Sequence, residues 1–525
     1  MPWYRILLLV ICASFIVTWS QAQTTTPRPT RCRFTIPRDI AIDCYTLTVP
    51  ENRETDNNRT IALSVAILRH SSGNPHPDPI LFLQGGPGGS TLTTLDLTYN
   101  NRFQPLFAAN RDIIIFDQRG TGTTHPSLDC IAYQGLQTSF LDYEFEGQSL
   151  SRSDITQQLN QALLDCGSGL ATVHDLGGYT TIQNAADIEA IRTAFGYEQL
   201  NLWGISYGTK LALTAMRDYP TSFRRVVLDS VYPLEANLYT ELPANFDHAL
   251  ETLFTHCQND MLCNRTYPNL ETTLFDTVDA LNTRAVRFNA PNPYTNQSFD
   301  GVIFDGNMLL QSIFRLLYVS ELLPRLPQLI YEAANGDFDV WLVLVGWLTA
   351  QRDSIALGMN YAIQCQEEFA FTAAGSIDTA WAMYPNFEDY SQSINRVSDL
   401  TPICDAFTTT NVPISENQAV QSAIPTLLIT GEYDPITPPR WAAQVSEQLS
   451  NSILLEFSSR GHGSSGNRGC AQTILIDYIQ LDDLSTLDTS CMDDIEMNFS
   501  GTRRGDFNLP PDSARHGIND ILTMP

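Results

Sequence analysis

Short runs of apolar residues place the strongest constraint on how this 525-residue chain can fold. Residues 79–83 and 113–116 are apolar at successive positions, and both runs are shorter than a typical helix. A strand of this kind is buried on both faces, which is typical of a parallel sheet covered by helices. A helix with one apolar stripe is predicted at 181–195, and strands and helices alternate around it. The pattern predicts an α/β fold with a mostly parallel, doubly wound sheet flanked by helices.

The alternation of strands and helices stops near residue 239. From 239 to 413 the sequence has long helical patterns and no short apolar strand, which predicts a helical cap lobe inserted into the core. Strands resume at 425–429 and 452–457. Before the parallel strands, β-branched residues alternate with polar ones over 44–70, which predicts an antiparallel hairpin.

The N-terminus has the pattern of a secretory signal peptide. Arg5 precedes an apolar stretch from Ile6 to about Trp19, and Ser20 and Ala22 are small residues placed for cleavage after residue 22. An uncleaved anchor is the alternative, but the apolar run is short for a bilayer. We therefore expect cleavage, no stable membrane insertion of the mature chain, and a secreted or periplasmic location.

The expected parts of the chain follow from these patterns. They are a signal peptide (1–22), a Thr/Pro-rich tether (23–31), a first part of the α/β core (32–238), a helical cap insertion (239–413), a second part of the core (414–491) and a polar C-terminal tail (492–525).

Charge and cysteine content exclude several functions. The chain has 30 Lys and Arg against 58 Asp and Glu, and a net charge of −28 repels nucleic acid and anionic lipid. The only lysine, Lys210, is not in a P-loop motif, which excludes that kind of nucleotide site. No C-x-x-C or H-E-x-x-H sequence supports zinc or thioredoxin-type chemistry. Without Cys12 of the predicted signal, ten cysteines remain, which indicates five disulfides in an oxidising compartment.

The segment 204–208, Gly-Ile-Ser-Tyr-Gly, matches the motif G-x-S-x-G. It follows a predicted strand that ends at Trp203 and begins a helix that extends to about Tyr219. This is the context of a strand-to-helix elbow, which lifts a serine hydroxyl out of the sheet. An ordinary Gly-Ser turn is the alternative. We predict that Ser206 is a catalytic nucleophile.

A serine nucleophile needs an acid and a base, which follow it along the chain in this type of sheet. Asp434 comes directly after the strand at 425–429, at the end of the sheet where ligands bind. Glu432 is a competing acid two residues earlier. His462 lies just past the next strand, whereas His516 lies in the tail with no strand before it. We predict His462 as the base and Asp434 as the acid that orients it.

The glycine-rich segment 84–90 follows a predicted buried strand. An acyl-transfer enzyme needs backbone N–H groups aimed at the developing oxyanion, and glycine allows the backbone to approach closely. The predicted oxyanion-hole donors are the N–H groups of Gly86 and Tyr207. A structural loop is the alternative, but it would not explain three such elements in the required order.

Together these motifs resemble the proline iminopeptidase and tripeptidyl aminopeptidase family of α/β-hydrolases, in particular a secreted subgroup with a tripeptidyl-aminopeptidase-like C-terminal region. The resemblance extends from Cys44 to Cys491, and Gln84 stands where the family often has histidine. It implies an α/β-hydrolase fold and cleavage of peptides at a free N-terminus, without a metal or cofactor. A carboxylester hydrolase with the same triad is the alternative, and a non-catalytic binding protein is a third possibility. The motifs that carry the resemblance are residues 84–89, 117–122, 204–209, 227–229, 431–434 and 461–463 with Cys470.

The resemblance also implies roles for particular acids. Acidic residues of the cap hold the substrate α-ammonium in this family, and Glu367, followed by Glu368, is the candidate here. A solvated charged surface is the alternative for both. Asp117 and Arg119 are expected to form an ion pair that holds the loop beside the site.

The disulfides are expected to join sequential neighbours within one region of the chain, and the family has C-terminal partners that resemble the last pair. The expected pairs are Cys32 with Cys44, Cys130 with Cys166, Cys257 with Cys263, Cys365 with Cys404, and Cys470 with Cys491.

Overall fold

Nine strands form one sheet in the computed structural model, which describes residues 26–145, 147–350, 355–388, 390, 397–408, 412–493 and 497–499. The strand order is β1-β2-β3-β5-β4-β8-β9-β12-β13. The pairs from β1 to β5 are antiparallel and all later neighbours are parallel, so the predicted hairpin and the mostly parallel sheet are confirmed. The strands are β1 (Arg28–Pro29), β2 (Ile42–Pro50), β3 (Thr60–Leu68), β4 (His76–Leu83), β5 (Arg111–Phe116), β8 (Leu200–Ile205), β9 (Phe223–Asp229), β12 (Thr426–Gly431) and β13 (Ser452–Phe457).

Alternate side chains along the strands pack into two different hydrophobic cores. Leu81 of β4 lies in one core with helices α4 (Thr181–Ala194) and α5 (Tyr207–Asp218). Its neighbour Ile80 lies in the other core with α17 (Cys470–Gln480). Both side chains are fully buried, as the uninterrupted apolar runs of the sequence require.

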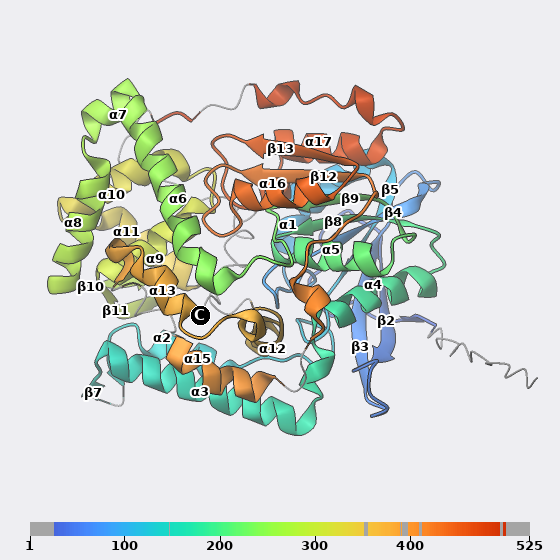
Figure 1. Ribbon diagram of the computed structural model, residues 1–525, viewed down its shortest axis with the longest axis horizontal. Coiled ribbons are helices and arrows are strands. Elements are labelled where there is room, and N and C mark those ends of the chain that lie inside the picture. Colours follow the sequence, from blue (N-terminus) through green and yellow to red (C-terminus); the bar gives the residue numbers. More distant parts are fainter. Residues whose placement is uncertain are drawn as a thin grey trace, which may run out of the picture.

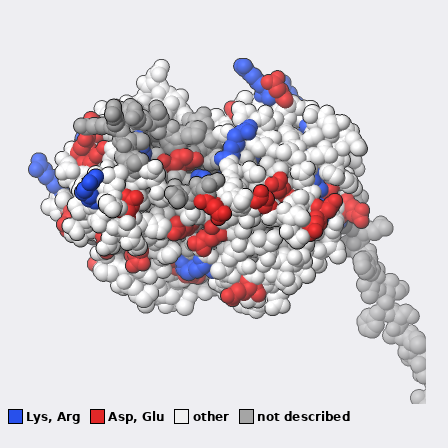
Figure 2. Space-filling model, turned by 90° about the horizontal axis from the view of Figure 1, so that it is seen from above, with Lys and Arg blue, Asp and Glu red and all other residues white. Residues whose placement is uncertain are grey.

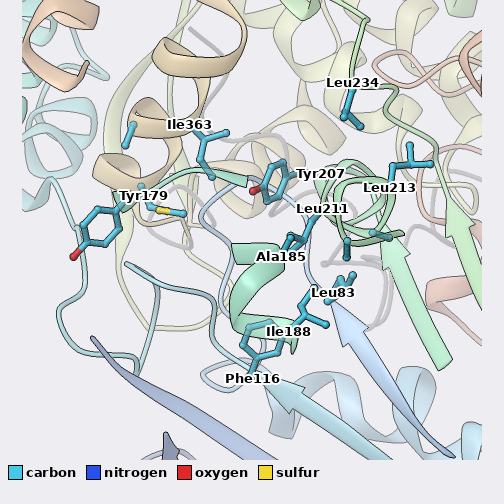
Figure 3. Close-up of a cluster of buried hydrophobic side chains, with 14 of the residues drawn as sticks. Leu83, Phe116, Tyr179, Ala185, Ile188, Tyr207, Leu211, Leu213, Leu234 and Ile363 are labelled. Atoms are coloured by element: carbon cyan, nitrogen blue, oxygen red, sulfur yellow. The ribbon is translucent and has the colours of Figure 1, made fainter. Parts of the chain in front are cut away.

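The first of these cores lies beneath the predicted nucleophile elbow. Figure 3 shows Leu83 and Phe116 of the sheet near Ala185 and Ile188 of α4 and Leu211 of α5. Because α5 is held by this packing, the residues at its N-terminus have fixed positions. Helix α16 (Pro439–Gln448) packs against β12 and β13, and the short helix α1 (Leu95–Thr98) follows the loop after β4. Helix α2 (Ile131–Ser139) packs against α3 (Arg152–Val173), and a short hairpin of β6 (Glu144–Phe145) and β7 (Gln148–Ser149) lies beside the cap, where Glu144 is 3.7 Å from Arg287.

A separate hydrophobic core joins the cap helices, which lie on the left of Figure 1. The cap also contains an antiparallel hairpin, β10 (Val286–Pro291) and β11 (Ser298–Phe304). The sequence predicts only helices between 239 and 413, and this prediction is wrong for the hairpin. Its signal in the sequence is an alternation with period two in β10, where Val286, Phe288 and Ala290 alternate with the polar Arg287 and Asn289. The cap helices are α6 (Leu238–Asn259), α7 (Met261–Thr266), α8 (Leu270–Thr283), α9 (Gly306–Leu317), α10 (Leu326–Ala334), α11 (Asp339–Thr349) and α13 (Ser376–Ala382).

Two other helices of the same sequence region pack elsewhere. Helix α12 (Leu357–Glu367) places Ile363 in the core beneath the elbow. Helix α15 (Val397–Phe407) lies along α3 (Arg152–Val173), as Figure 1 shows. The stretch between the two core parts is therefore not one lobe in its packing, because α12 belongs to the α/β core.

Five disulfides join the pairs of sequential neighbours expected above. Among the described residues, no helix combines the length and apolar character needed to cross a membrane. Acidic side chains are spread over the face shown in Figure 2, in keeping with the net charge of −28. The predicted signal peptide and most of the predicted tail lie outside the described residues.

Candidate active site

Ser206 lies in the sharp turn between β8 and α5. Its φ of 59° is in the left-handed region, which a residue other than glycine adopts only when its surroundings hold it there. The two flanking glycines are required for close packing. A Cβ on Gly204 would collide with the Gly208 carbonyl, and a Cβ on Gly208 would collide with the Leu83 carbonyl. The turn therefore has the geometry of a nucleophile elbow and lies against the end of β4.

Asp434 and His462 lie side by side although 28 residues separate them in the sequence. His462 Nδ1 is 2.7 Å from Asp434 Oδ2, and both side chains are fully buried. Asp434 also accepts hydrogen bonds from the backbone N–H groups of Ile436 and Thr437. Burial opposes the charge on Asp434, but the His462 ring and these hydrogen bonds keep the pKa of the carboxyl below its usual value. The carboxylate can therefore stay ionised and orient the imidazole.

The competing acid, Glu432, has other partners. Its carboxylate lies 3.3 Å from His256 Nε2 and accepts a hydrogen bond from the Ser459 backbone N–H at 3.3 Å. The structure thus brings Asp434, and not Glu432, to His462. The alternative base His516 lies outside the described residues.

The glycine-rich loop after β4 is held by hydrogen bonds from the start of α12. Gly86 has a φ of +119°, and a Cβ there would lie 2.8 Å from the Gly88 nitrogen, so glycine is needed at this position. Asn360 Nδ2 of α12 donates to the Pro87 carbonyl at 2.9 Å, and the Ala356 N–H donates to the Gly88 carbonyl at 3.0 Å. The N-terminal end of α12 therefore fixes the loop that carries one predicted oxyanion donor.

Asp229 and Ser230, at the end of β9, connect the elbow of Ser206 to the segment that follows His462. The Asp229 carbonyl accepts from the Ser206 N–H at 3.0 Å, and its carboxylate accepts from Ser465 N and Oγ, both at 2.6 Å. Ser230 Oγ accepts from the Gly463 N–H at 2.8 Å. Burial raises the pKa of Asp229 to about 6. Sequence reasoning includes residues 227–229 only as part of the resemblance, although β9 ends at the same sheet edge as β8 and β12 and so could have drawn attention to Asp229.

Glu367 and Glu368 are not surface acids. They are 1% and 3% exposed, and they share the ammonium of Lys210, which forms an ion pair with Glu368 and lies 3.9 Å from Glu367. Glu367 also accepts from Thr181 N at 2.5 Å and from Thr181 Oγ1 at 2.6 Å. Burial raises the pKa of Glu367 to about 7. The expected role in binding a substrate ammonium is corrected here, because an internal ammonium already occupies the position beside both carboxylates.

The expected ion pair between Asp117 and Arg119 is wrong. Asp117 Oδ1 accepts hydrogen bonds from the backbone of Thr91 and Leu92, at 2.9 and 3.0 Å. Arg119 pairs instead with Asp187 at 2.7 Å. Asp117 therefore holds the loop beside the site through hydrogen bonds, which satisfies a fully buried carboxylate without an adjacent cation.

Comparison with known proteins agrees with this geometry. The family model described as "alpha/beta hydrolase fold" matches residues 78–288, which include the elbow and the glycine-rich loop. The chain is an α/β-hydrolase. A second model, described as "TAP-like protein", matches residues 391–491 of this hydrolase, which include Asp434 and His462. Within the described residues, no group of His, Cys, Asp and Glu side chains is arranged to hold a metal ion.

Curated relatives are similar to this hydrolase at low identity. The putative hydrolase YuaR of Escherichia coli is 23% identical over 457 residues, which cover 83% of this chain and 85% of the relative. The serine protease Hip1 of Mycobacterium tuberculosis is 23% identical over 443 residues, which cover 78% and 80%. The tripeptidyl aminopeptidase of Streptomyces lividans is 26% identical over 228 residues, which cover 42% of each. The resemblance to the proline iminopeptidase and tripeptidyl aminopeptidase family is confirmed, and the relatives support a hydrolase of the peptidase type.

Proposed function

We propose that this hydrolase is a serine aminopeptidase that removes residues or short peptides from free N-termini. The observation that carries the proposal is the buried Asp434–His462 pair at the same sheet edge as the elbow of Ser206. This arrangement supports acyl transfer, and the names of the relatives favour a peptide over an ester as the substrate.

The proposed reaction uses the side chains in two stages. Ser206 Oγ attacks the scissile carbonyl while His462 takes its proton, and the N–H groups of Gly86 and Tyr207 stabilise the oxyanion. His462 then gives the proton to the leaving amine, and the acyl group stays on Ser206. In the second stage a water molecule attacks the acyl-enzyme with His462 as base, which releases the acid and restores the serine. Asp434 orients the imidazole throughout, and no metal or cofactor enters any step.

The proposed location is secreted or periplasmic. Five disulfides support it, because such bonds persist in oxidising compartments. The signal peptide expected at residues 1–22 would deliver the chain there.

The proposal is tested with three substrate types: peptide p-nitroanilides with a free N-terminus, the same anilides with an acetylated N-terminus, and p-nitrophenyl esters. We expect hydrolysis of the free anilides and a loss of about tenfold or more in kcat/KM on acetylation, since acetylation removes a charge that the site must recognise. Ser206→Ala should lower kcat on the free anilide by about 10⁴-fold or more while the far-UV circular dichroism spectrum is retained. Equal rates on free and acetylated anilides would exclude the aminopeptidase assignment, and activity on esters alone would favour the carboxylester hydrolase.

A further inference from the structure

A pocket lies beside His462, at the contact between the cap and the core. One wall is the cap segment 318–321, and the others come from the segment 460–464, the start of α17 and Arg102. The centre of the Tyr318 ring is 4.6 Å from that of the His462 ring, and the Tyr318 carbonyl accepts from the backbone N–H of His462 at 3.2 Å. The pocket is therefore next to the segment that carries the predicted catalytic base.

The charged residues of this pocket are mainly arginines, which is unusual in a chain with a net charge of −28. Arg102, Arg460 and Arg468 line it, and among the described residues of the lining only Glu321, which is exposed, is acidic. Three cations against one anion leave the pocket positive. A positive pocket in an acidic protein indicates a ligand of opposite charge.

Arg460 and Arg468 have no acidic partner among the residues that the structure describes. Arg468 donates to the Asn100 carbonyl and to Gln104 Oε1, which are both neutral acceptors. The side chain of Arg460, two residues before His462, makes no hydrogen bond or ion pair with any residue that the structure describes. The half-buried guanidinium of Arg460 is suited to a planar anion, because its N–H groups match the two oxygens of a carboxylate.

The position next to His462 identifies which part of a substrate reaches the pocket. In the proposed function, on which this inference rests, His462 gives its proton to the amine of the leaving peptide. The leaving peptide therefore extends from His462, and when it is short its C-terminal carboxylate is only a few bonds from that amine. We propose that the arginine-lined pocket binds the terminal carboxylate of a short leaving peptide. The hydrolase would then prefer short peptides with a free C-terminus over longer or amidated ones.

The test is a binding measurement that needs no turnover. Isothermal titration of the Ser206→Ala protein with di-alanine and tetra-alanine, each as the free acid and as the C-terminal amide, covers leaving peptides of one and three residues. We expect the acid to bind about tenfold more tightly than the amide for at least one length, as a charge-assisted hydrogen bond provides. Arg460→Gln in the same background should remove most of this preference. Arg287→Gln, which removes one exposed cation of the cap hairpin, should preserve it.

Two results would overturn the proposal. Equal affinities of acid and amide at both lengths would exclude a carboxylate subsite even if Arg460→Gln does not fold. A preference that survives Arg460→Gln would show that the carboxylate binds elsewhere. Failure of the aminopeptidase assignment is detected separately, by the anilide assays on the enzyme with Ser206 intact.

Discussion

Two groups of buried carboxylates, Asp434 in one and Glu367 with Glu368 in the other, have different kinds of partner. Asp434 faces His462, a side chain whose charge can change during a reaction. Glu367 and Glu368 face Lys210, a cation that lies four residues after Ser206 and stays charged when it is paired. Burial and a perturbed pKa therefore do not identify a catalytic acid by themselves. The partner distinguishes a carboxylate that assists chemistry from one that stabilises the fold.

Between the two groups of carboxylates, the larger expected effect comes from Asp434. Asp434→Asn should lower kcat on a free-N-terminus anilide by about 10³–10⁴-fold, because the amide no longer holds His462 in the correct tautomer. The matched control is Glu432→Gln, two residues away and paired with His256, which should keep kcat within about threefold. Similar losses in the two variants would contradict the assignment of the acid.

The next largest effect is on the stability of the folded protein, and it comes from the buried group around Lys210. Lys210→Met leaves two buried carboxylates without their shared cation, which should reduce the free energy of unfolding by about 3–5 kcal/mol in urea titration. Adding Glu368→Gln to this variant should restore part of the loss, because it removes one unpaired charge. A double variant that is less stable than Lys210→Met would show that the ion pair is not the source of the effect.

A smaller effect is a pH dependence of stability. The pKa of Glu367 is raised to about 7 in the folded protein, above the usual value of 4.5, so the folded state binds this proton more tightly than the unfolded state. Its contribution is present at low pH and is lost as the pH rises from about 4.5 to 7. Glu367→Gln should therefore reduce the fall in unfolding free energy between pH 5 and pH 8 by about 1–3 kcal/mol. An unchanged pH profile, measured beside Glu432→Gln as control, would remove Glu367 as the titrating group.

The smallest expected effect is on substrate selectivity, and it tests whether Glu367 has a role in substrate binding. Because Glu367 binds Thr181 and lies beside Lys210, Glu367→Gln should change the ratio of rates on free and acetylated anilides by less than about threefold. Kinetics at saturating and limiting substrate give the ratio. A ratio that falls to near one would show that Glu367 binds the substrate ammonium. Glu367 would then belong to the active site and would not be a residue that only stabilises the fold.

Local patterns in the sequence predict much of the fold. The uninterrupted apolar runs predict strands with two buried faces, and Leu81 and Ile80 indeed pack into different cores. The spacing of glycines around Ser206 predicts an elbow, and its positive φ is observed. These predictions are confirmed because strand burial and backbone conformation depend on residues that are close in the sequence.

The failures concern partners that are distant in the sequence. Lys210 and Glu368 are 158 residues apart, and no local pattern indicates that they meet. Arg119 pairs with Asp187, 68 residues away, rather than with the nearby Asp117. The cap hairpin is a different case, since its alternation is visible at β10 but is short and lies among long helical patterns. Sequence reasoning therefore identifies reactive residue types better than it identifies their charge partners.

The central claim is that Ser206 is the nucleophile, and covalent labelling tests it most directly. The protein is treated with diisopropyl fluorophosphate, and the adduct is located by peptide mass spectrometry while anilide hydrolysis is followed in the same sample. We expect one adduct, on Ser206, whose formation parallels the loss of activity. The Ser206→Ala protein should keep its unlabelled mass after the same treatment. An adduct at another serine that parallels the loss of activity, or full activity with Ser206 completely labelled, would contradict the account.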